Sequence, residues 1–329
     1  MNVLLARGDG IGDALVCAPL VAALRDAGHR VGVLLATANR DAFAAGAFER
    51  VHVLERIPWP RHGSPPRSRR RALAEVRAER YDAALIASEE MEMYAFVRAA
   101  AVAHRIGFIN GWQKPLKSVQ VRLLLTRAVV RPAAAGDARE HEAVTLFRLG
   151  RGLHAESEPT RDVARLRPLV LDGPVSRHGC VALQVSNKFV ASGLDEAAYV
   201  EIARALRERG FVALVLGNDA ALVRRVASAA GMPAATGLGT KAWKARLAGA
   251  SVVVTPDCGA AHVAGLVGVP CVDLFAANSA TALDIARWRP WAGLARARVL
   301  DRTLPARSLA AEIADDALAL ALRTQSALP

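Results

Sequence analysis

Short apolar runs alternate with amphipathic stretches along both halves of the chain, which is the pattern of strands followed by helices. Units of this kind build parallel sheets that bind ligands at the carboxyl ends of their strands. The pattern therefore predicts an α/β protein with mainly parallel sheets. In the first half it predicts strands at 2–6, 31–36, 51–54, 81–87 and 105–108, and helices at 13–27, 39–48, 70–79 and 91–103.

A segment rich in Pro, Arg and Gly with weak periodicity, residues 156–179, indicates an interdomain linker. The alternation restarts after it, and 329 residues exceed one comfortable core. We therefore expect two domains, 1–160 and 161–305, and a closing helix at 306–329. In the second half the pattern predicts strands at 181–185, 212–216, 251–254 and 269–275, and helices at 195–209, 220–230, 241–248 and 308–323, with a further helix ending near Gly268.

Composition narrows the class of protein. Hydrophobic residues make up 53% of the chain, which favours a well-packed globular protein. The four cysteines form no CxxC pair, so we expect reduced thiols in a cytoplasmic protein. Arg7, Asp9 and Asp13 interrupt the apolar start, which argues against a signal peptide, and no uninterrupted apolar run approaches the ~20 residues of a membrane span.

The formal net charge is +12, and one group of arginines is dense. Such a cluster attracts nucleic acid, an anionic membrane face or a phosphorylated or carboxylated substrate. No helix-turn-helix, RNP-like or zinc-finger signature is present, so we expect no nucleic acid partner. A purely solubilising surface is an equal alternative. The cluster, in a stretch broken by Pro, Gly and Ser that predicts a loop, comprises Arg61, Arg67, Arg69, Arg70 and Arg71.

The most informative motif is Thr255–His262, in which a short apolar strand meets a helix rich in Ala and Gly. A strand followed by a small-residue turn and a helix aims unpaired N–H groups and a partial positive charge at one point. Such a point suits a phosphate or diphosphate. Asp257 ends the strand and His262 lies about one turn into the helix, so both can face one ligand. The alternative is an ordinary N-cap Asp and a helix His.

The loop Arg7–Asp13 joins the first strand to the first helix. Its glycine spacing does not match the dinucleotide fingerprint, Asp13 stands where a third glycine belongs, and no acidic residue follows the second strand. These features argue against a nicotinamide enzyme. The glycines, Gly12 among them, allow close approach of a substrate, and Asp13 could remove a proton from an attacking hydroxyl. Alternatively, Asp13 only complements the helix dipole.

Taken in order, these segments resemble the heptosyltransferase family, glycosyltransferase family 9. The resemblance covers nearly the whole chain, and Asp257–His262 followed by Gly268-Val269-Pro270 is its most specific part. It implies the GT-B fold, in which two Rossmann-like parallel-sheet domains face a cleft. The other segments that carry the resemblance are Gly12-Asp13, Tyr81-Asp82, Arg105–Phe108 and His141-Glu142.

The resemblance implies an inverting, metal-independent transfer of a sugar, usually heptose from ADP-heptose, to an acceptor hydroxyl, with no cofactor besides the nucleotide-sugar substrate. Asp13 matches the family's base, and Asp219 falls where family members bind the donor ribose. An acceptor of the lipopolysaccharide-core type is anionic, so the protein could work at the inner membrane face. The donor candidates are Gly12, Ser186, Asn187, Lys188, Asp219, Asp257, Cys258, Gly259 and His262, and the acceptor candidates are Arg67, Arg69, Arg70 and Arg71.

The chain departs from the family at three places. The family's Lys-x-Trp-Pro segment is 192–195 here and has no lysine, so Lys188 could reach the donor phosphates instead, or it could be a surface lysine. The family's Gly-Pro-Thr is replaced at 276–278, and Cys258 stands for the motif threonine. Loss of a threonine hydroxyl removes one hydrogen bond while backbone contacts remain. These changes concern the identity of the donor more than the fold.

Three other functions stay open from the sequence. The chain could transfer another sugar or use another acceptor, it could be a sugar-nucleotide epimerase of the same fold, or it could be a non-catalytic nucleotide-sugar or polyanion-binding relative. Glu89 and Glu90 follow the strand at 81–87 and could bind sugar hydroxyls or offset the arginines.

Overall fold

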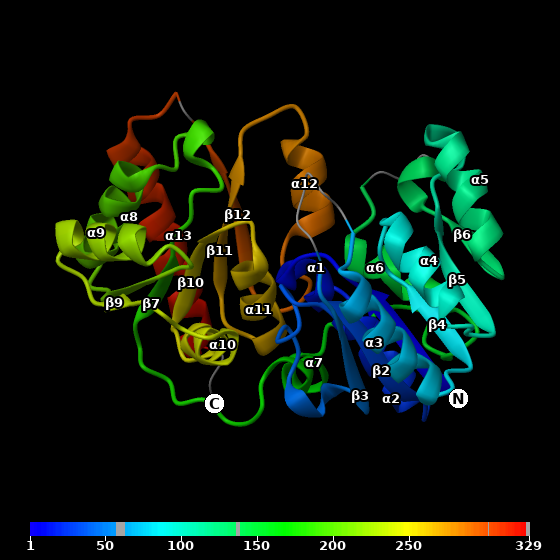
Figure 1. Cartoon of the computed structure of the whole chain (residues 1–329). Helices are drawn as coiled ribbons and strands as arrows, with labels where there is room; N and C mark the ends of the chain where they lie inside the picture. The colour runs from blue at the N-terminus through cyan, green and yellow to red at the C-terminus, as the bar shows by residue number, and fades with distance from the viewer. Residues whose placement is uncertain (57–62, 136–138, 302, 327–329) are drawn as a thin grey trace. The chain divides into compact units, whose positions relative to one another are not determined.

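The computed structural model describes residues 1–56, 63–135, 139–301 and 303–326. By its internal contacts the chain divides into two compact units, Met1–Thr160 and Arg161–Pro329. Each unit contains a six-stranded parallel sheet with helices on its faces (Figure 1).

The sheet of the first unit has the order β3-β2-β1-β4-β5-β6, and all neighbouring strands run parallel. The central strand β1 is covered on both faces, which explains the apolar run from Val3 to Ala6 within it. Its register places Leu5 beside Val33 on one side and Leu85 on the other. The strands are β1 Asn2–Arg7, β2 Arg30–Ala36, β3 Arg50–Leu54, β4 Ala83–Ile86, β5 His104–Ile109 and β6 Arg127–Val130.

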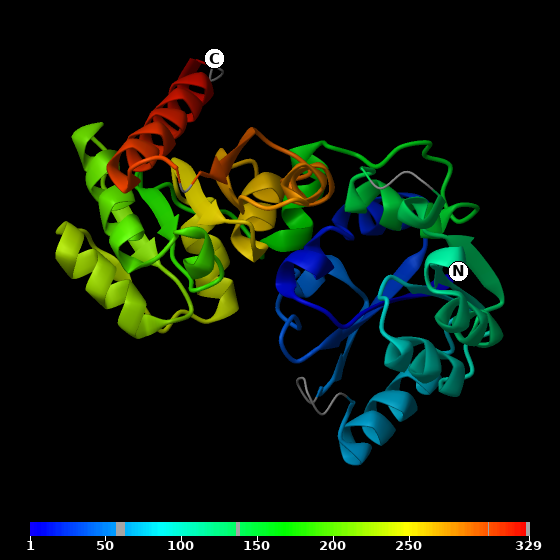
Figure 2. The same cartoon turned by 90° about the horizontal axis from the view of Figure 1, so that it is seen from above.

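Helices α3, α4 and α5 share one apolar cluster with the strands, through Val76, Phe96 and Val121 among others. Figure 2 shows these cyan helices on one side of the blue strands, with green helices on the other. The α-helices are α1 Ile11–Leu15, α2 Ala18–Asp26, α3 Pro66–Ala78, α4 Met91–Ala99, α5 Pro115–Leu124 and α6 Glu142–Phe147. The 3-10 helices are η1 Ala45–Ala47, η2 Gly111–Gln113, η3 Pro132–Ala135 and η4 Arg148–Gly150.

The sheet of the second unit has the order β12-β11-β10-β7-β8-β9, again with parallel neighbours. Strand β10 lies between β7 and β11, so its carboxyl end is central in the sheet. The strands are β7 Val181–Gln184, β8 Ala213–Leu216, β9 Ala234–Ala235, β10 Val252–Pro256, β11 Cys271–Ala276 and β12 Ala295–Leu300.

Helices α8, α9 and α13 form a core with the second sheet, to which Tyr199, Val223 and Ile313 contribute. Asp195 and Asp219 cap α8 and α9 by accepting backbone N–H groups of the first turn. The helices are α7 Val163–Val170, α8 Glu196–Glu208, α9 Ala220–Ala230, α10 Thr240–Ala248, α11 Gly259–Val267, α12 Thr281–Trp288 and α13 Ala306–Ser326, and η5 is Val190–Ser192.

Several sequence expectations about local structure were wrong. The helix expected at 13–27 is interrupted, and α2 restarts with Pro19 near its beginning, where proline is tolerated. No α-helix forms over 39–48, because the Asn39 side chain accepts the N–H of Ala36 and holds a turn instead. The expected linker contains α7, whose Arg167 donates to the carbonyl of Val267 in α11. The pattern did not predict α5, β6, α6, α12 or β12.

None of the helices among the described residues is both long and apolar enough to span a bilayer.

Candidate functional site

The first candidate site lies in the first unit, where β1 ends and α1 begins. Asp13 is the third residue of α1, and its Oδ2 accepts the N–H of Gly10 at 3.1 Å. Its Oδ1 accepts a hydrogen bond from Nη2 of Arg7, the last residue of β1, at 3.0 Å. Both carboxylate oxygens are therefore fixed, while about a third of the side chain (35%) remains exposed.

The guanidinium group of Arg7 contacts both acidic residues of this loop, Asp9 and Asp13. Its side chain is buried, donates to the carbonyl oxygen of Ala87 after β4, and places Nε 3.0 Å from Oδ2 of Asp9. Burial raises the pKa of Asp9, and the positive charge of Arg7 opposes that rise. Asp13 is the more exposed of the two carboxyl groups that share this guanidinium. The arrangement can present one oriented carboxylate to a substrate hydroxyl.

The second candidate site lies in the second unit, at the carboxyl end of β10. Asp257 follows the strand, Cys258 is the N-cap residue, and α11 begins with Gly259 and two alanines. The Ala261 N–H donates to the Cys258 carbonyl, and the Ala260 N–H donates to the Cys258 thiol, which is a weak acceptor. No side chain caps the helix, so the N–H groups of Gly259 and Ala260 suit an anionic ligand. The Cys258 thiol lies 3.3 Å from the hydroxyl of Thr255, and burial raises its pKa.

Lys188 reaches this helix start from the segment after β7. Its Nζ lies 3.0 Å from Oδ2 of Asp257 and also donates to the main-chain oxygen of that residue. The ammonium group lies 4.9 Å from the centre of the Phe189 ring, and close to half of the lysine side chain is exposed. The structure thus places a cation beside the first turn of α11, although 69 residues separate Lys188 from Asp257.

Asn187 and Asp219 lie together at the ends of β7 and β8. Oδ1 of Asp219 caps α9, and its Oδ2 lies 3.4 Å from the Asn187 amide nitrogen. The pKa of Asp219 is lowered, mainly because its carboxylate accepts a hydrogen bond from the N–H of Leu222. Gly217 is required before this cap, because a Cβ there would lie 2.4 Å from the carbonyl oxygen of Val185. The main-chain carbonyl oxygen of Ser186 accepts a hydrogen bond from the Tyr199 hydroxyl.

The two remaining donor candidates differ in setting. His262, in the first turn of α11, is buried, and its ring meets Trp288 edge-on with 6.5 Å between centroids. Gly12 belongs to the first unit, where its carbonyl accepts the N–H of Val16, the residue that caps the carboxyl end of α1. The structure therefore brings Lys188 to Asp257 and Asn187 to Asp219, whereas Gly12 and Asp13 lie in the other unit.

Asp273 is a buried acidic residue that was not among the site residues expected from the sequence. This residue lies in β11 beside Thr255 of β10, and its side chain is completely buried. Neither carboxyl oxygen has a hydrogen-bond partner among the described residues. Burial and then the charge of Asp257 raise the pKa of Asp273 well above its usual range. An acidic residue inside the apolar run 269–275 was the signal in the sequence.

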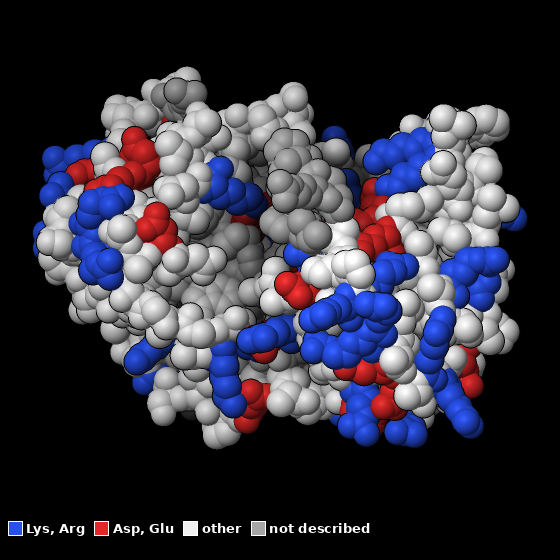
Figure 3. Space-filling model, viewed as in Figure 1, with Lys and Arg blue, Asp and Glu red and all other residues white. Residues whose placement is uncertain are grey.

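The acceptor candidates all lie in α3. The expectation of a loop was wrong for Arg67 and Arg69, whereas Arg70 and Arg71 fall in the helix expected at 70–79. Residues 67, 69, 70 and 71 form the first turns of α3, and Arg61 lies outside the described residues. Blue side chains gather over α3 in Figure 3. Arg69 lies 3.7 Å from Glu92 and faces the Phe96 ring, whereas Arg67 and Arg70 are exposed. The N-terminus of a helix carries a partial positive charge from its dipole, and the arginine side chains add to it. The positive potential at this turn therefore has two sources.

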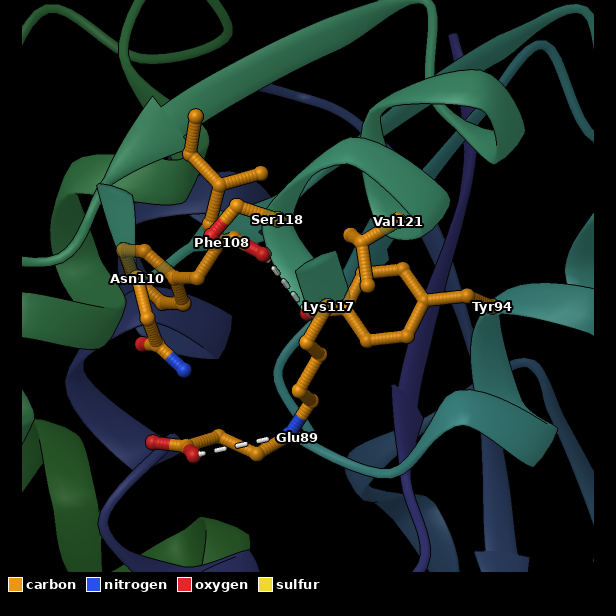
Figure 4. Close-up of a pocket in the computed structure, with 8 residues that line it drawn as sticks. Glu89, Tyr94, Phe108, Asn110, Lys117, Ser118 and Val121 are labelled. Atoms are coloured by element: carbon orange, nitrogen blue, oxygen red, sulfur yellow. Dashed lines mark hydrogen bonds and ion pairs between the residues drawn. The ribbon is translucent and has the colours of Figure 1, made fainter. Parts of the chain in front are cut away.

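Glu89 and Glu90 offset basic side chains other than those of α3. Oε1 of Glu89 lies 3.0 Å from Nε of Arg131, and its Oε2 lies 3.9 Å from Lys117. Figure 4 shows Lys117 pointing to Glu89 at the mouth of a small pocket beneath α5. Glu90 pairs with Arg56 at 2.5 Å. The two glutamates therefore hold the loop after β4 against its basic neighbours.

Comparison with solved structures shows the same fold in bacterial sugar transferases. E. coli heptosyltransferase WaaC with ADP is 17% identical, with a TM-score of 0.75 over 96% of this chain and 100% of that one. E. coli ADP-heptose lps heptosyltransferase II is 16% identical (TM-score 0.71; 99% and 100% covered). The family 9 glycosyl transferase from Veillonella parvula is 12% identical (TM-score 0.73; 98% and 97%).

These likenesses confirm the expected GT-B architecture of α/β units. A search of the curated proteins finds no match in sequence. The sequence model of glycosyltransferase family 9 (heptosyltransferase) matches residues 69–308, which is well over half of the chain. The chain therefore belongs to glycosyltransferase family 9 and is a glycosyltransferase with the heptosyltransferase-like GT-B fold.

Proposed function

We propose that the protein transfers a heptose or a related sugar from an ADP-sugar to the hydroxyl of an anionic glycan of the lipopolysaccharide-core type, with inversion and without a metal ion. The observation that carries this proposal is the Asp13 carboxylate, which Arg7 and the Gly10 N–H orient while part of it stays exposed. A fixed and accessible carboxylate is what a general base for a sugar hydroxyl requires.

In this proposal the donor diphosphate binds at the start of α11. The first-turn N–H groups and the ammonium of Lys188 would balance the charge of the diphosphate as it leaves, which is the task that a metal ion performs in other transferases. Asp257 is a positioning residue that holds Lys188 at this place. Oδ2 of Asp219, beside Asn187, is the candidate acceptor for the ribose hydroxyls.

The chemical step is a single displacement. Asp13 takes the proton of the acceptor hydroxyl, the oxygen attacks the anomeric carbon, and the bond from that carbon to the diphosphate oxygen breaks. The bonding electrons and the negative charge leave with the nucleoside diphosphate. Because the attack comes from the face opposite the leaving group, the anomeric configuration inverts.

The choice of nucleotide and acceptor follows from charge and from the relatives. The neighbouring structures of WaaC hold ADP and ADP-2-deoxy-2-fluoro heptose, which supports an adenine nucleotide donor here. Arg67 and Arg70 at the exposed start of α3 suit the phosphate and carboxylate groups of an inner-core glycan, because guanidinium groups bind both as forks.

Calorimetric titration with ADP, UDP and GDP, each with and without Mg²⁺, tests the donor side. We expect ADP to bind most tightly and its affinity to be independent of Mg²⁺. Preference for another nucleotide would reassign the donor, and binding of none would favour a non-catalytic relative. ADP-heptose is then incubated with and without a lipopolysaccharide-core acceptor, because turnover of the sugar without any acceptor would indicate an epimerase.

A further inference from the structure

The outer face of α5 and the turn before it expose large apolar side chains. Trp112 is 94% exposed, and Leu116, Val119 and Leu123 are 81%, 62% and 72% exposed. The three residues of α5 follow the i, i+3, i+7 spacing that places side chains on one side of a helix. Together with Trp112 they form an apolar stripe, the α5 stripe.

The fold of the unit does not use this stripe. The inward side of α5 carries Ser118, which donates to the carbonyls of Gly111 and Lys114, and Val121, which belongs to the apolar cluster beneath the helix. Single exposed apolar residues are normal on protein surfaces, but a continuous row of large ones marks an interaction site.

Basic side chains border the α5 stripe. Arg122 lies on the exposed part of the helix next to Leu123, and Arg98 of α4 donates to the carbonyl oxygen of Leu123 at 3.4 Å. Lys114, just before the helix, borders the other end, and its side chain is exposed although its Nζ lies 3.7 Å from Oε2 of Glu89. In Figure 3 the surface at the upper right, where α5 lies in Figure 1, is largely white, and a group of blue side chains borders it.

We propose that the α5 stripe docks the protein onto a bilayer that contains anionic phospholipids. A row of Trp, Leu and Val side chains can enter the boundary between headgroups and acyl chains, and the basic border complements the negative surface of such a bilayer. A helix of ten residues lies in the plane of the interface and does not cross it. Charge complementarity selects the lipid surface over a second copy of this chain, whose net charge of +12 would repel it.

The same layer of helices connects the stripe to the basic start of α3. Arg69 of α3 contacts Glu92 and Phe96 of α4, and Arg98 of α4 contacts α5. Resting on the proposed function, docking through α5 would bring a lipid-linked acceptor to this side of the unit. The docking itself does not depend on the identity of the sugar.

Flotation of the purified full chain with vesicles tests the docking. We expect binding to vesicles of phosphatidylcholine with phosphatidylglycerol and little binding to phosphatidylcholine alone. The double variant Leu116→Glu/Leu123→Glu should lower the partition coefficient by about tenfold or more, because it removes apolar contact and adds repulsion. The matched control, Leu294→Glu/Leu322→Glu, changes two exposed leucines of the second unit and should bind like the wild type.

Equal flotation of the two double variants would overturn the proposal, as would a concentration-dependent dimer that only the α5 variant abolishes. Titration of ADP into the same samples separates this result from the proposed function. Retained ADP binding with no flotation removes only the docking, whereas absent ADP binding in the wild type with normal flotation removes only the donor assignment. Unchanged thermal unfolding of both variants shows that the surface changes leave the fold intact.

Discussion

Nζ of Lys188 lies 3.0 Å from Oδ2 of Asp257, and it also donates to the main-chain carbonyl oxygen of that residue. These two contacts attach the segment after β7 to the end of β10, two neighbouring strands of the second sheet. They also hold a cation beside the first turn of α11, and close to half of the lysine side chain remains exposed to an incoming ligand. A diphosphate arriving at the helix could therefore share this ammonium group.

Replacing Lys188 by Met should weaken ADP binding by roughly 10- to 100-fold, because a hydrogen bond to a charged group contributes about 1.5–3 kcal/mol. Calorimetry measures the dissociation constant. Lys241→Met is the matched control, since Lys241 forms an exposed ion pair with Asp172 elsewhere in the unit and should leave ADP affinity unchanged. Equal affinities of the two variants would show that the diphosphate does not bind Lys188.

Replacing Asp13 by Asn should lower kcat by about 10²–10⁴-fold while the dissociation constant of ADP stays nearly constant, because the amide keeps the shape of the side chain but cannot accept a proton. The comparison variant is Asp9→Asn, which contacts the same Arg7 from the other side. It should lose much less activity than Asp13→Asn. The reverse order would assign the base to Asp9.

Much of the fold could be predicted because its strands are buried on both faces and read as apolar runs. The expected helix at 220–230 and the strands near 31–36 and 51–54 are confirmed nearly to the residue. The missed helix α12 is only eight residues long and contains no fully buried residue, so its sequence carries no core signal. The expected helix at 39–48 failed because a hydrogen bond from the Asn39 side chain decides the local turn.

The candidate sites were predicted less completely, since they depend on contacts between distant parts of the chain. The motif at 255–262 marked the end of β10, but no spacing rule joins Lys188 to Asp257. Arg7 was visible only as the start of a glycine loop, although it bridges Asp9 and Asp13. The basic cluster was assigned to a loop because of its prolines, one of which, Pro66, is the first residue of α3.

The buried pair of Arg131 and Glu142 should be important for the stability of the first unit. Two hydrogen bonds of 3.1 and 2.9 Å join the guanidinium to the carboxylate, and both side chains are almost fully buried. Glu142→Ala should lower the free energy of unfolding by about 3–5 kcal/mol, because it leaves the guanidinium with less compensation. Glu201→Ala breaks the exposed pair with Arg204 and should cost about 1 kcal/mol or less in the same urea titration.

Asp273 should make the stability of the second unit fall as the pH rises. Its pKa is raised in the folded state, so the folded state binds the proton more tightly than the unfolded state does. The resulting stabilisation is complete below the ordinary carboxyl pKa and is lost as the pH rises toward the folded pKa. Within that window the wild type should lose about 1.4 kcal/mol per pH unit relative to Asp273→Asn, whose amide does not titrate.

Urea unfolding of both proteins between about pH 5 and pH 7 measures this difference, because every other titrating group is common to the two and cancels. Asp301→Asn is the control, because the pKa of Asp301 is shifted in the opposite direction to that of Asp273. Thr303 hydrogen bonds lower the pKa of Asp301, so its contribution changes only below the ordinary carboxyl pKa and should be constant in this range. A constant difference between wild type and Asp273→Asn would mean that the Asp273 carboxyl does not titrate with a raised pKa, and that a polar group or water reaches it beneath α11.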